Sequence, residues 1–282
     1  MTSSPFITAY AFLIGLCAGS FLNVCVERWP ADLSVIRPRS RCPKCGHQLA
    51  WFENVPVISW LALRARCRSC AEPISAIYPL GEIAVGVLWA LCASRWGATF
   101  TAVRVAMFLT LLTGVALTDL RHYLIPDGFT VTGLLWTLAS ALAAPFLGET
   151  LLFAGPYDAL VGACAGAGLI AIVGWLGEAA LKREAMGMGD MTLMAFVGAA
   201  LGPPRAILTV FLGAAIGAVV FLGVVYPMAL IRRGRVASQT ELALGSAPMD
   251  LPLVPFGVFL APAAVAMLLW GDQLIDRLFL GM

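Results

Sequence analysis

The chain has 282 residues, of which 60% are hydrophobic and 12% charged, with a formal net charge of +2. A soluble domain carries about 45–50% apolar and about 25% charged residues, so this composition excludes a soluble globular protein. It indicates an all-α polytopic membrane protein in contact with membrane lipid, and the weak net charge gives no reason to expect nucleic acid as a partner.

Eight apolar segments are candidates for transmembrane helices, because about 20 helical residues cross a 30 Å hydrocarbon core. The first segment has no basic region before it, so we expect a retained helix and not a cleaved signal peptide. We divide the chain into a first transmembrane helix (1–26), a four-cysteine domain (27–75) and a larger transmembrane domain (76–282). The predicted spans are residues 6–26, 77–94, 102–118, 128–147, 157–181, 190–202, 206–231 and 253–271.

Basic residues predict the orientation. Eight of the eighteen Lys and Arg residues lie between residues 27 and 75, the only long polar region. If this region is cytoplasmic, alternating loops place six more on the same side: Arg121, Lys182, Arg183, Arg232, Arg233 and Arg235. The positive-inside rule therefore favours a cytoplasmic four-cysteine domain and an external N-terminus.

Two C-x2-C pairs occur in this region, Cys42 with Cys45 and Cys67 with Cys70. Four thiolates complete a tetrahedral shell around one ion, so we expect a structural Zn²⁺ in a zinc-ribbon-like fold. A redox pair is the alternative, but a reducing cytoplasm argues against disulfides. The nearby His47 is either a substitute ligand or an ordinary polar loop residue.

Small residues recur within the predicted spans. Glycines one helical turn apart allow close helix contact in lipid, so these pairs predict a tightly packed bundle. Four cysteines in the spans are expected to be small buried side chains. The glycine pairs are Gly162/Gly166, Gly198/Gly202 and Gly213/Gly217, and the cysteines are Cys17, Cys25, Cys92 and Cys164.

Two aspartates lie where an apolar segment ends or begins. Asp119 closes the segment 102–118, and Asp190 opens a segment with only eleven residues from Met191 to Leu201. Such a segment covers about 17 Å, so we expect a short helix that starts below the membrane surface within reach of water. Asp127, after Pro126, is expected to cap the following helix.

Two carboxylates that share a proton can hydrolyse a peptide bond. One takes a proton from water while the other protonates the carbonyl oxygen, and like charges at close range cannot both stay ionised. Gly187 and Gly189 would let an extended substrate approach Asp190 closely. The residue types make a pair of Asp119 and Asp190 chemically coherent, but a juxtamembrane solvated charge is the alternative for Asp119.

Five stretches in this order resemble the type IV prepilin peptidase family, a group of GxGD-type intramembrane aspartyl proteases. They are residues 19–30, the cysteine pairs with 54–61, residues 74–80, residues 119–127 around the first aspartate, and residues 187–193, which contain Gly187-Met-Gly-Asp190.

The resemblance implies a multi-pass enzyme of the bacterial inner membrane whose active site faces the cytoplasm. Such enzymes remove the short leader of type IV prepilins and type II secretion pseudopilins after a glycine. Many then methylate the new N-terminus with S-adenosylmethionine. The resemblance implies that Asp119 and Asp190 are the catalytic pair and that the metal is structural.

Two other hypotheses remain open. A peptidase without methyltransferase activity fits the same motifs, because the sequence contains no glycine-rich cofactor fingerprint. A transporter with proton-carrying aspartates is the less favoured class, because the two carboxylates lie at one membrane face and not along a pathway through both.

Overall fold

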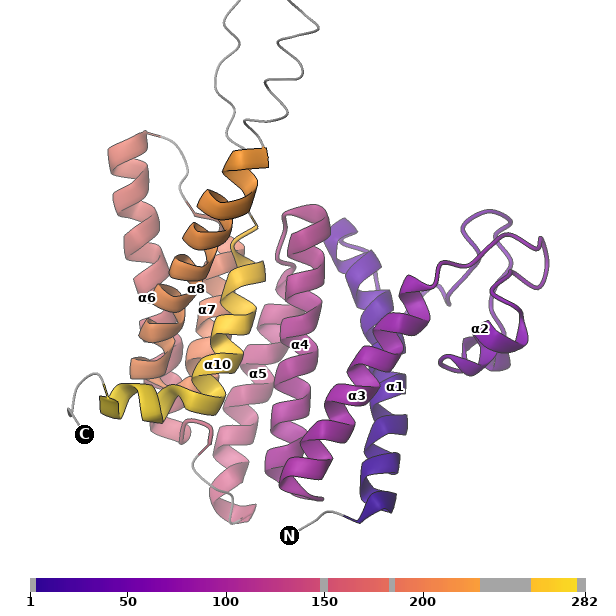
Figure 1. Ribbon diagram of the computed structural model, residues 1–282, viewed down its shortest axis with the longest axis horizontal. Coiled ribbons are helices and arrows are strands. Elements are labelled where there is room, and N and C mark those ends of the chain that lie inside the picture. The colour runs from indigo at the N-terminus through magenta and orange to yellow at the C-terminus, as the bar shows by residue number, and fades with distance from the viewer. Residues whose placement is uncertain (1–3, 148–151, 183–185, 229–254, 278–282) are drawn as a thin grey trace, which may run out of the picture.

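The computed structural model describes residues 4–147, 152–182, 186–228 and 255–277 (Figure 1). Within these residues the chain is helical, with no named β-strand, and seven helices are long and apolar enough to cross a membrane. The long helices are α1 (Pro5–Arg28), α3 (Ile77–Trp96), α4 (Phe100–His122), α5 (Asp127–Ala143), α6 (Pro156–Leu181), α8 (Pro203–Val220) and α10 (Gly257–Ile275).

The sixth predicted segment, residues 190–202, forms a shorter apolar helix, α7 (Met188–Leu201). Its 14 residues span about 21 Å, which is less than the hydrocarbon thickness of a bilayer. The prediction of a short helix beginning at Asp190 is therefore confirmed, with its first residue two positions earlier. The remaining short elements are η1 (Trp29–Ala31), η2 (Trp51–Asn54), α2 (Ile58–Ala62), η3 (Ala144–Leu147) and η4 (Phe221–Val225).

Several predicted features lie outside the described residues. They are Arg183, Arg232, Arg233 and Arg235, which entered the orientation argument, and the segment ends at 229–231 and 253–254.

Local sequence accounts for the ends of the helices. Thr99 caps α4, because its Oγ1 accepts a hydrogen bond from the Ala102 N–H at 3.2 Å. Proline occupies the first turn of α1, α6 and α8, where its missing N–H costs nothing. Gly202 separates α7 from α8 with a φ of 80°, in the left-handed region that favours glycine.

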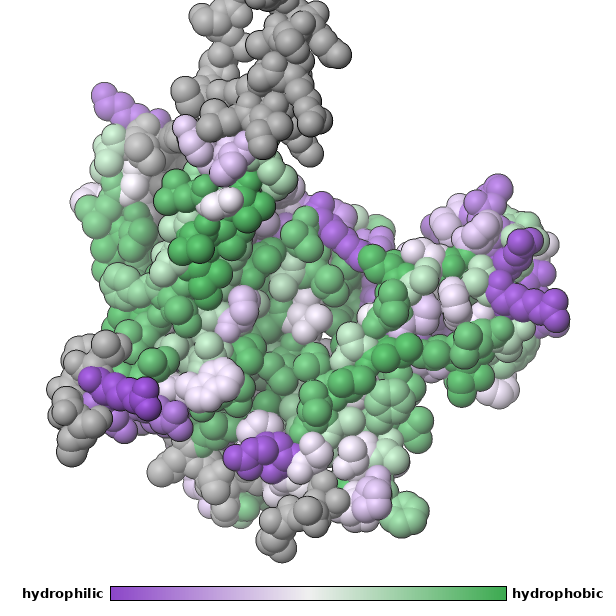
Figure 2. Space-filling model, in the orientation of Figure 1, coloured by the Kyte–Doolittle hydropathy of each residue, from purple (hydrophilic) through white to green (hydrophobic). Residues whose placement is uncertain are grey.

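α4 lies at the centre of the bundle, against α1, α3, α5 and α10. Its Phe108 is buried and packs edge-on against Phe196 of α7, with ring centroids 5.3 Å apart, and against Phe153 at 6.0 Å. Figure 2 shows hydrophobic side chains over the flanks of the helices, with hydrophilic residues near their ends and on the projecting loop. This pattern is that of a multi-pass membrane protein.

α6 and α7 pack with their backbones in contact. A β-carbon on Gly162 would lie 2.1 Å from the carbonyl oxygen of Gly198, and one on Gly166 would lie 2.1 Å from that of Met194. Only glycine permits such an approach, so the predicted close packing at these positions is confirmed. Gly213 and Gly217 of α8 instead face side chains of α10.

Residues 29–76, named here the loop module, project beside α3 (Figure 1). The buried carboxylate of Glu82 in α3 accepts a hydrogen bond from the Val57 N–H at 2.7 Å. Trp29 packs edge-on against Phe129 of α5, with centroids 4.4 Å apart. These contacts attach the loop module to the bundle at two places.

The expectation for the cysteines within the spans is half wrong. Cys25 and Cys92 are buried as predicted, but Cys17 and Cys164 are exposed on the surfaces of α1 and α6. In a bilayer an apolar side chain is stable on the lipid-facing side as well as inside the bundle, so apolar composition does not distinguish the two.

Candidate functional site

Asp119 lies in the last turn of α4 and is only 4% exposed. Its Oδ2 accepts a hydrogen bond from the Val258 N–H at 3.1 Å, at the start of α10. A β-carbon on Gly257 would lie 2.9 Å from the same oxygen. The N-terminus of α10 therefore holds this carboxylate with backbone donors that the helix itself does not use.

Asp190 lies in the first turn of α7 and is partly exposed. Gly187 is the N-cap of this helix, and its carbonyl accepts the Asp190 N–H at 3.2 Å. The carboxylates of Asp119 and Asp190 lie within electrostatic range of each other. The structure thus brings the two predicted residues to one place, with Asp119 inside the bundle and Asp190 nearer the surface.

Ile125 packs between the two halves of this site. A β-carbon on Gly189 would lie 2.9 Å from Cβ of Ile125, and one on Gly257 would lie 2.9 Å from its Cδ1. Gly189 thus packs against another residue of the same chain, Ile125. Gly187 has no atom nearer than 3.7 Å to an added β-carbon, so it leaves the more open backbone beside Asp190.

The packing of α6 against α7 gives the level of Asp190. The facing pairs are Gly162 with Gly198, Gly166 with Met194 and Gly174 with Met186, so the two residue numbers always add to 360. Asp190 is therefore level with Ile170, eleven residues before Leu181 at the end of α6. Those eleven residues rise about 16 Å, so the carboxylate is recessed well below the end of α6.

Two further polar residues, His122 and Asp127, lie close to Asp119 in the sequence. Asp127 is the first residue of α5, and the N-cap position is taken by Pro126 without a side-chain cap, so the predicted capping role is wrong. An aspartate in the first turn still interacts favourably with the helix dipole. His122 is exposed at the end of α4.

Sequence reasoning missed Ile125, Gly257 and Val258. The Gly-x-Gly-Asp motif identifies only its own residues. The amide that donates a hydrogen bond to Asp119 belongs to Val258, 139 positions later in the sequence. The signal that was available is Gly257, a glycine at the start of an apolar segment.

The four predicted cysteines come together in the loop module, with all four sulfurs within 4.8 Å of one another. The Sγ atoms of Cys42 and Cys70 are 3.8 Å apart, and those of Cys45 and Cys67 are 3.9 Å apart. Tetrahedral zinc–thiolate bonds of about 2.3 Å place sulfurs about 3.8 Å from one another. The cysteines are not disulfide-bonded, and this donor set fits zinc.

The two cysteine pairs form similar turns. The Cys42 N–H donates to the His47 carbonyl, and the Cys67 N–H donates to the Glu72 carbonyl in the same way. Backbone donors at Cys45 and Lys44 lower the pKa of the Cys42 thiol to about 6, which favours the metal-binding thiolate. The Glu72 N–H acts in the same sense on Cys70, but burial and the neighbouring thiols outweigh it and raise that pKa to about 12.

Glu53 is a buried acidic residue of the loop module. Its buried carboxylate accepts the Ala50 N–H at 2.8 Å and contacts His47 Nε2 at 3.1 Å, with Arg68 at 4.0 Å. These partners lower the pKa of Glu53, with the Ala50 N–H as the main cause. His47 is therefore engaged by Glu53, as expected of a polar loop residue and not of a metal ligand.

Comparison with known proteins gives two adjacent family matches. Residues 13–96 match the Bacterial Peptidase A24 N-terminal domain, and residues 106–222 match the Type IV leader peptidase family. The first match contains the four cysteines of the loop module, and the second contains both aspartates. No solved structure gives a significant match.

Curated relatives cover nearly the whole chain. A prepilin leader peptidase/N-methyltransferase of Myxococcus xanthus (strain DK1622) is 43% identical over 88% of this chain and 70% of its own length. Proteins of the same name from Pseudomonas aeruginosa and Bacillus subtilis are 36% and 31% identical, over 95% and 94% of this chain and 91% and 95% of their own lengths. Together with the two family matches, these relatives establish that the chain belongs to the type IV leader peptidase family.

Proposed function

We propose that this chain is a membrane aspartyl endopeptidase that removes the leader of type IV prepilins or type II secretion pseudopilins after a glycine. The observation that carries the proposal is the proximity of Asp119 and Asp190, which lie within electrostatic range of each other in a member of the type IV leader peptidase family. The carboxylates come from α4 and α7, which touch through Phe108 and Phe196 and both pack against α5 and α10.

The geometry supports a shared-proton mechanism. Asp190 is partly exposed, so water reaches the pair from its side, whereas Asp119 is buried against the start of α10. One carboxylate removes a proton from the attacking water while the other donates its proton to the carbonyl oxygen of the scissile bond. Gly187 supplies open backbone beside Asp190, where an extended substrate can lie.

The distribution of basic residues and the depth of Asp190 support a location for the site. We propose that the loop module and the aspartate pair face the cytoplasm of a bacterial inner membrane, because basic residues concentrate on that side. The recess of about 16 Å below the end of α6 supports a position for Asp190 within the membrane boundary and open to cytoplasmic water. The division at residues 26 and 75 then separates one transmembrane helix, a zinc domain and the peptidase domain.

We also propose that residues 42–70 hold one structural zinc ion through Cys42, Cys45, Cys67 and Cys70. The ion would cross-link two turns that lack an apolar core of their own. It lies in the loop module and not among the residues around Asp119, so it has no part in peptide hydrolysis.

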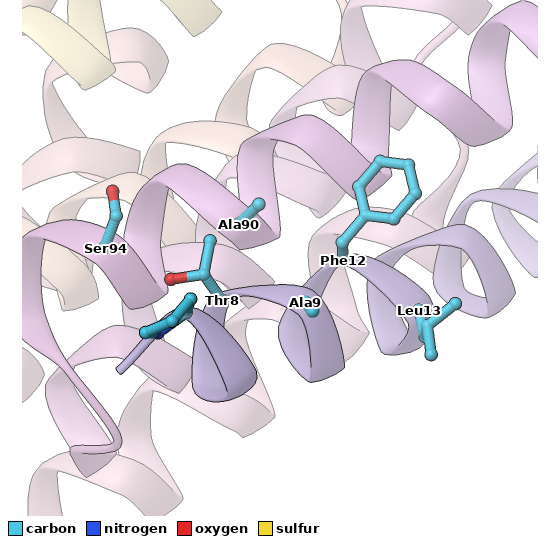
Figure 3. Close-up of a pocket in the computed structure, with 7 residues that line it drawn as sticks. Thr8, Ala9, Phe12, Leu13, Ala90 and Ser94 are labelled. Carbon is cyan, nitrogen blue, oxygen red and sulfur yellow. The ribbon is translucent and has the colours of Figure 1, made fainter. Parts of the chain in front are cut away.

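Methylation of the new N-terminus is proposed from the names of the relatives, with S-adenosylmethionine as the donor. The donor carries a sulfonium and an ammonium group. One pocket, between α1 and α3, has no charged residue (Figure 3), and a second, beside the loop module, presents Arg28 and Arg39 without an acidic residue. Neither pocket offers an acidic side chain to the two cationic groups of the donor, so we derive no methyl-transfer step from them.

The decisive experiment replaces Asp119 or Asp190 by Asn and co-expresses each variant with a prepilin in a host without its own peptidase. Both variants should leave the leader attached at wild-type protein abundance. Asp127→Asn is the matched control, because this exposed aspartate lies eight positions from Asp119 and outside the pair.

Processing by either active-site variant would refute the peptidase assignment. Mass spectrometry of the mature N-terminus, in the same host, separates the two activities. An unmethylated but correctly cut product would restrict the function to proteolysis.

A further inference from the structure

A pocket of about 450 Å³ lies between the C-terminal half of α1 and residues 35–56 of the loop module. One wall is α1, from Cys17 to Arg28, and the other includes Arg39, Trp51 and Asn54. Neither the two aspartates nor the four clustered thiols line this pocket, so it is separate from the sites described above.

The α1 wall is apolar and faces away from the bundle. Cys17 is exposed and Phe21 is 54% exposed, although both lie inside a helix that is apolar enough to span a membrane. From Cys17 to Arg28 the helix rises by 11 residues, or about 16 Å. In a bilayer this wall begins among the acyl chains and ends at the headgroups.

Two arginines line the pocket, and Arg28 lies at the headgroup end of its α1 wall. Arg28 donates from Nη1 to the Ser34 carbonyl at 2.9 Å, and Arg39 is exposed. Among the residues that the structure describes, neither arginine is in an ion pair, and Glu27 pairs with Arg121 instead. The described lining contains no acidic side chain, so the pocket is cationic.

A second groove on α1 lacks these charges. It lies between the N-terminal half of α1 and α3, measures about 760 Å³ and has no charged residue in its lining (Figure 3). Such a groove accommodates any acyl chain. An apolar wall that ends at two guanidinium groups selects an amphiphile with an anionic head.

We propose that the pocket beside the loop module binds one anionic phospholipid, with an acyl chain along Phe21 and Cys17 and the phosphate between Arg28 and Arg39. Guanidinium groups form charge-assisted hydrogen bonds with phosphate oxygens. The exposed side of α1 continues into the pocket, so the chain enters directly from the bilayer. The lipid bridges α1 and residues 35–56 and protects that segment from proteolysis. The site does not depend on the proposed peptidase activity.

The test uses the full-length, zinc-loaded protein in a neutral detergent. Native mass spectrometry follows the binding of phosphatidylglycerol and of phosphatidylcholine with the same acyl chains. Inorganic phosphate is tested as an anion that lacks an acyl chain. We expect one tightly bound phosphatidylglycerol and protection of residues 35–56. We expect no comparable binding of phosphatidylcholine or phosphate.

The double variant R28Q/R39Q should weaken phosphatidylglycerol binding roughly thirtyfold, the effect of two lost arginine–phosphate attractions at a membrane surface. R64Q/R95Q loses the same charge away from the pocket and should bind as the wild type does. Arg39→Gln alone, at an exposed side chain, should lose roughly fivefold and guards against misfolding of the double variant.

Three outcomes would overturn the proposal. Equal binding of phosphatidylcholine would indicate ordinary annular lipid, and equal protection by inorganic phosphate would indicate a simple anion site. Unchanged phosphatidylglycerol binding by both R28Q/R39Q and Arg39→Gln would remove the arginines from the site.

Discussion

The loop module and the helix pair α6–α7 keep their shapes by opposite means. In the module, four thiols and a buried carboxylate bring together turns that have few apolar contacts. In α6–α7, two backbones touch because Gly162, Gly166 and Gly198 have no side chain. One region depends on polar contacts and on four thiols that fit a metal ion, and the other depends on close packing, so each should fail under a treatment that spares the other.

Metal removal should have the largest effect, and it should be confined to the module. Structural zinc contributes on the order of 10 kcal/mol of binding free energy, which the folding of a small domain requires. A chelator or Cys67→Ser should therefore expose residues 29–76 to protease while the helical circular dichroism signal of the bundle persists. Cys164→Ser, at an exposed cysteine of α6, serves as the control.

Zinc analysis of the same samples decides the outcome. A metal-free module that still resists protease would show that its fold does not need the ion, and the contrast with the bundle would fail.

Gly162→Ala should damage the bundle and spare the module. The added β-carbon would meet the Gly198 carbonyl oxygen at 2.1 Å, so α6 and α7 must separate. Overpacking of this kind costs about 1–3 kcal/mol and lowers the melting temperature in detergent. On the same helix, Gly168→Ala meets no atom within 4 Å and should be neutral or slightly stabilising. Equal melting temperatures for the two variants would contradict the close contact.

Glu53→Gln should weaken the module by a smaller amount, because the amide keeps the Ala50 hydrogen bond but loses the charge that faces His47 and Arg68. At pH 7 the variant should lose zinc to a chelator faster than the wild type does. The pKa of Glu53 is lowered in the folded state, so the carboxylate stabilises the fold above its ordinary value of 4.5 and loses this contribution only at more acidic pH.

The difference between the two proteins should accordingly be constant from pH 6 to pH 8. A difference that disappeared within this range would exclude the charge of Glu53 as its source.

The smallest effect should come from exchanging residues at equivalent positions of the two cysteine turns. Gly46 and Ala71 follow the second cysteine of each pair and both have positive φ, 73° and 58°. Ala71→Gly should stabilise the module and Gly46→Ala should destabilise it, each by about 1 kcal/mol. Zinc-retention curves for the two variants should shift in opposite directions, and a shift in the same direction would exclude backbone strain as the cause.

The sequence predicted the helices well, because a lipid environment requires long apolar segments and leaves few alternatives. It also predicted the glycine contacts of α6 and the clustering of four cysteines. It did not predict which side of a span faces lipid, as Cys17 and Cys164 demonstrate. Burial in a bundle depends on the orientation of each helix about its own axis. The presence of an apolar residue does not indicate that orientation.

The aspartates were recognisable because charged residues are rare beside apolar segments, whereas the residues that hold them were not. Ile125 is an ordinary apolar side chain, and Val258 contributes only its backbone N–H. A contact made by a main-chain atom is possible for almost any residue type, so the sequence does not reveal it. The surroundings of Asp119 therefore required a three-dimensional structure.

The hydrogen bond from Val258 to Asp119 has a consequence for anyone who shortens this protein. The matched family region ends at residue 222, and α10 lies wholly beyond it. A fragment cut at that boundary would keep both aspartates and every residue of the Gly-x-Gly-Asp motif, yet Asp119 would lose the amide donor at its Oδ2. The smallest unit that preserves the site must extend through Ile275, so the last helix belongs in any truncated or transplanted form of the enzyme.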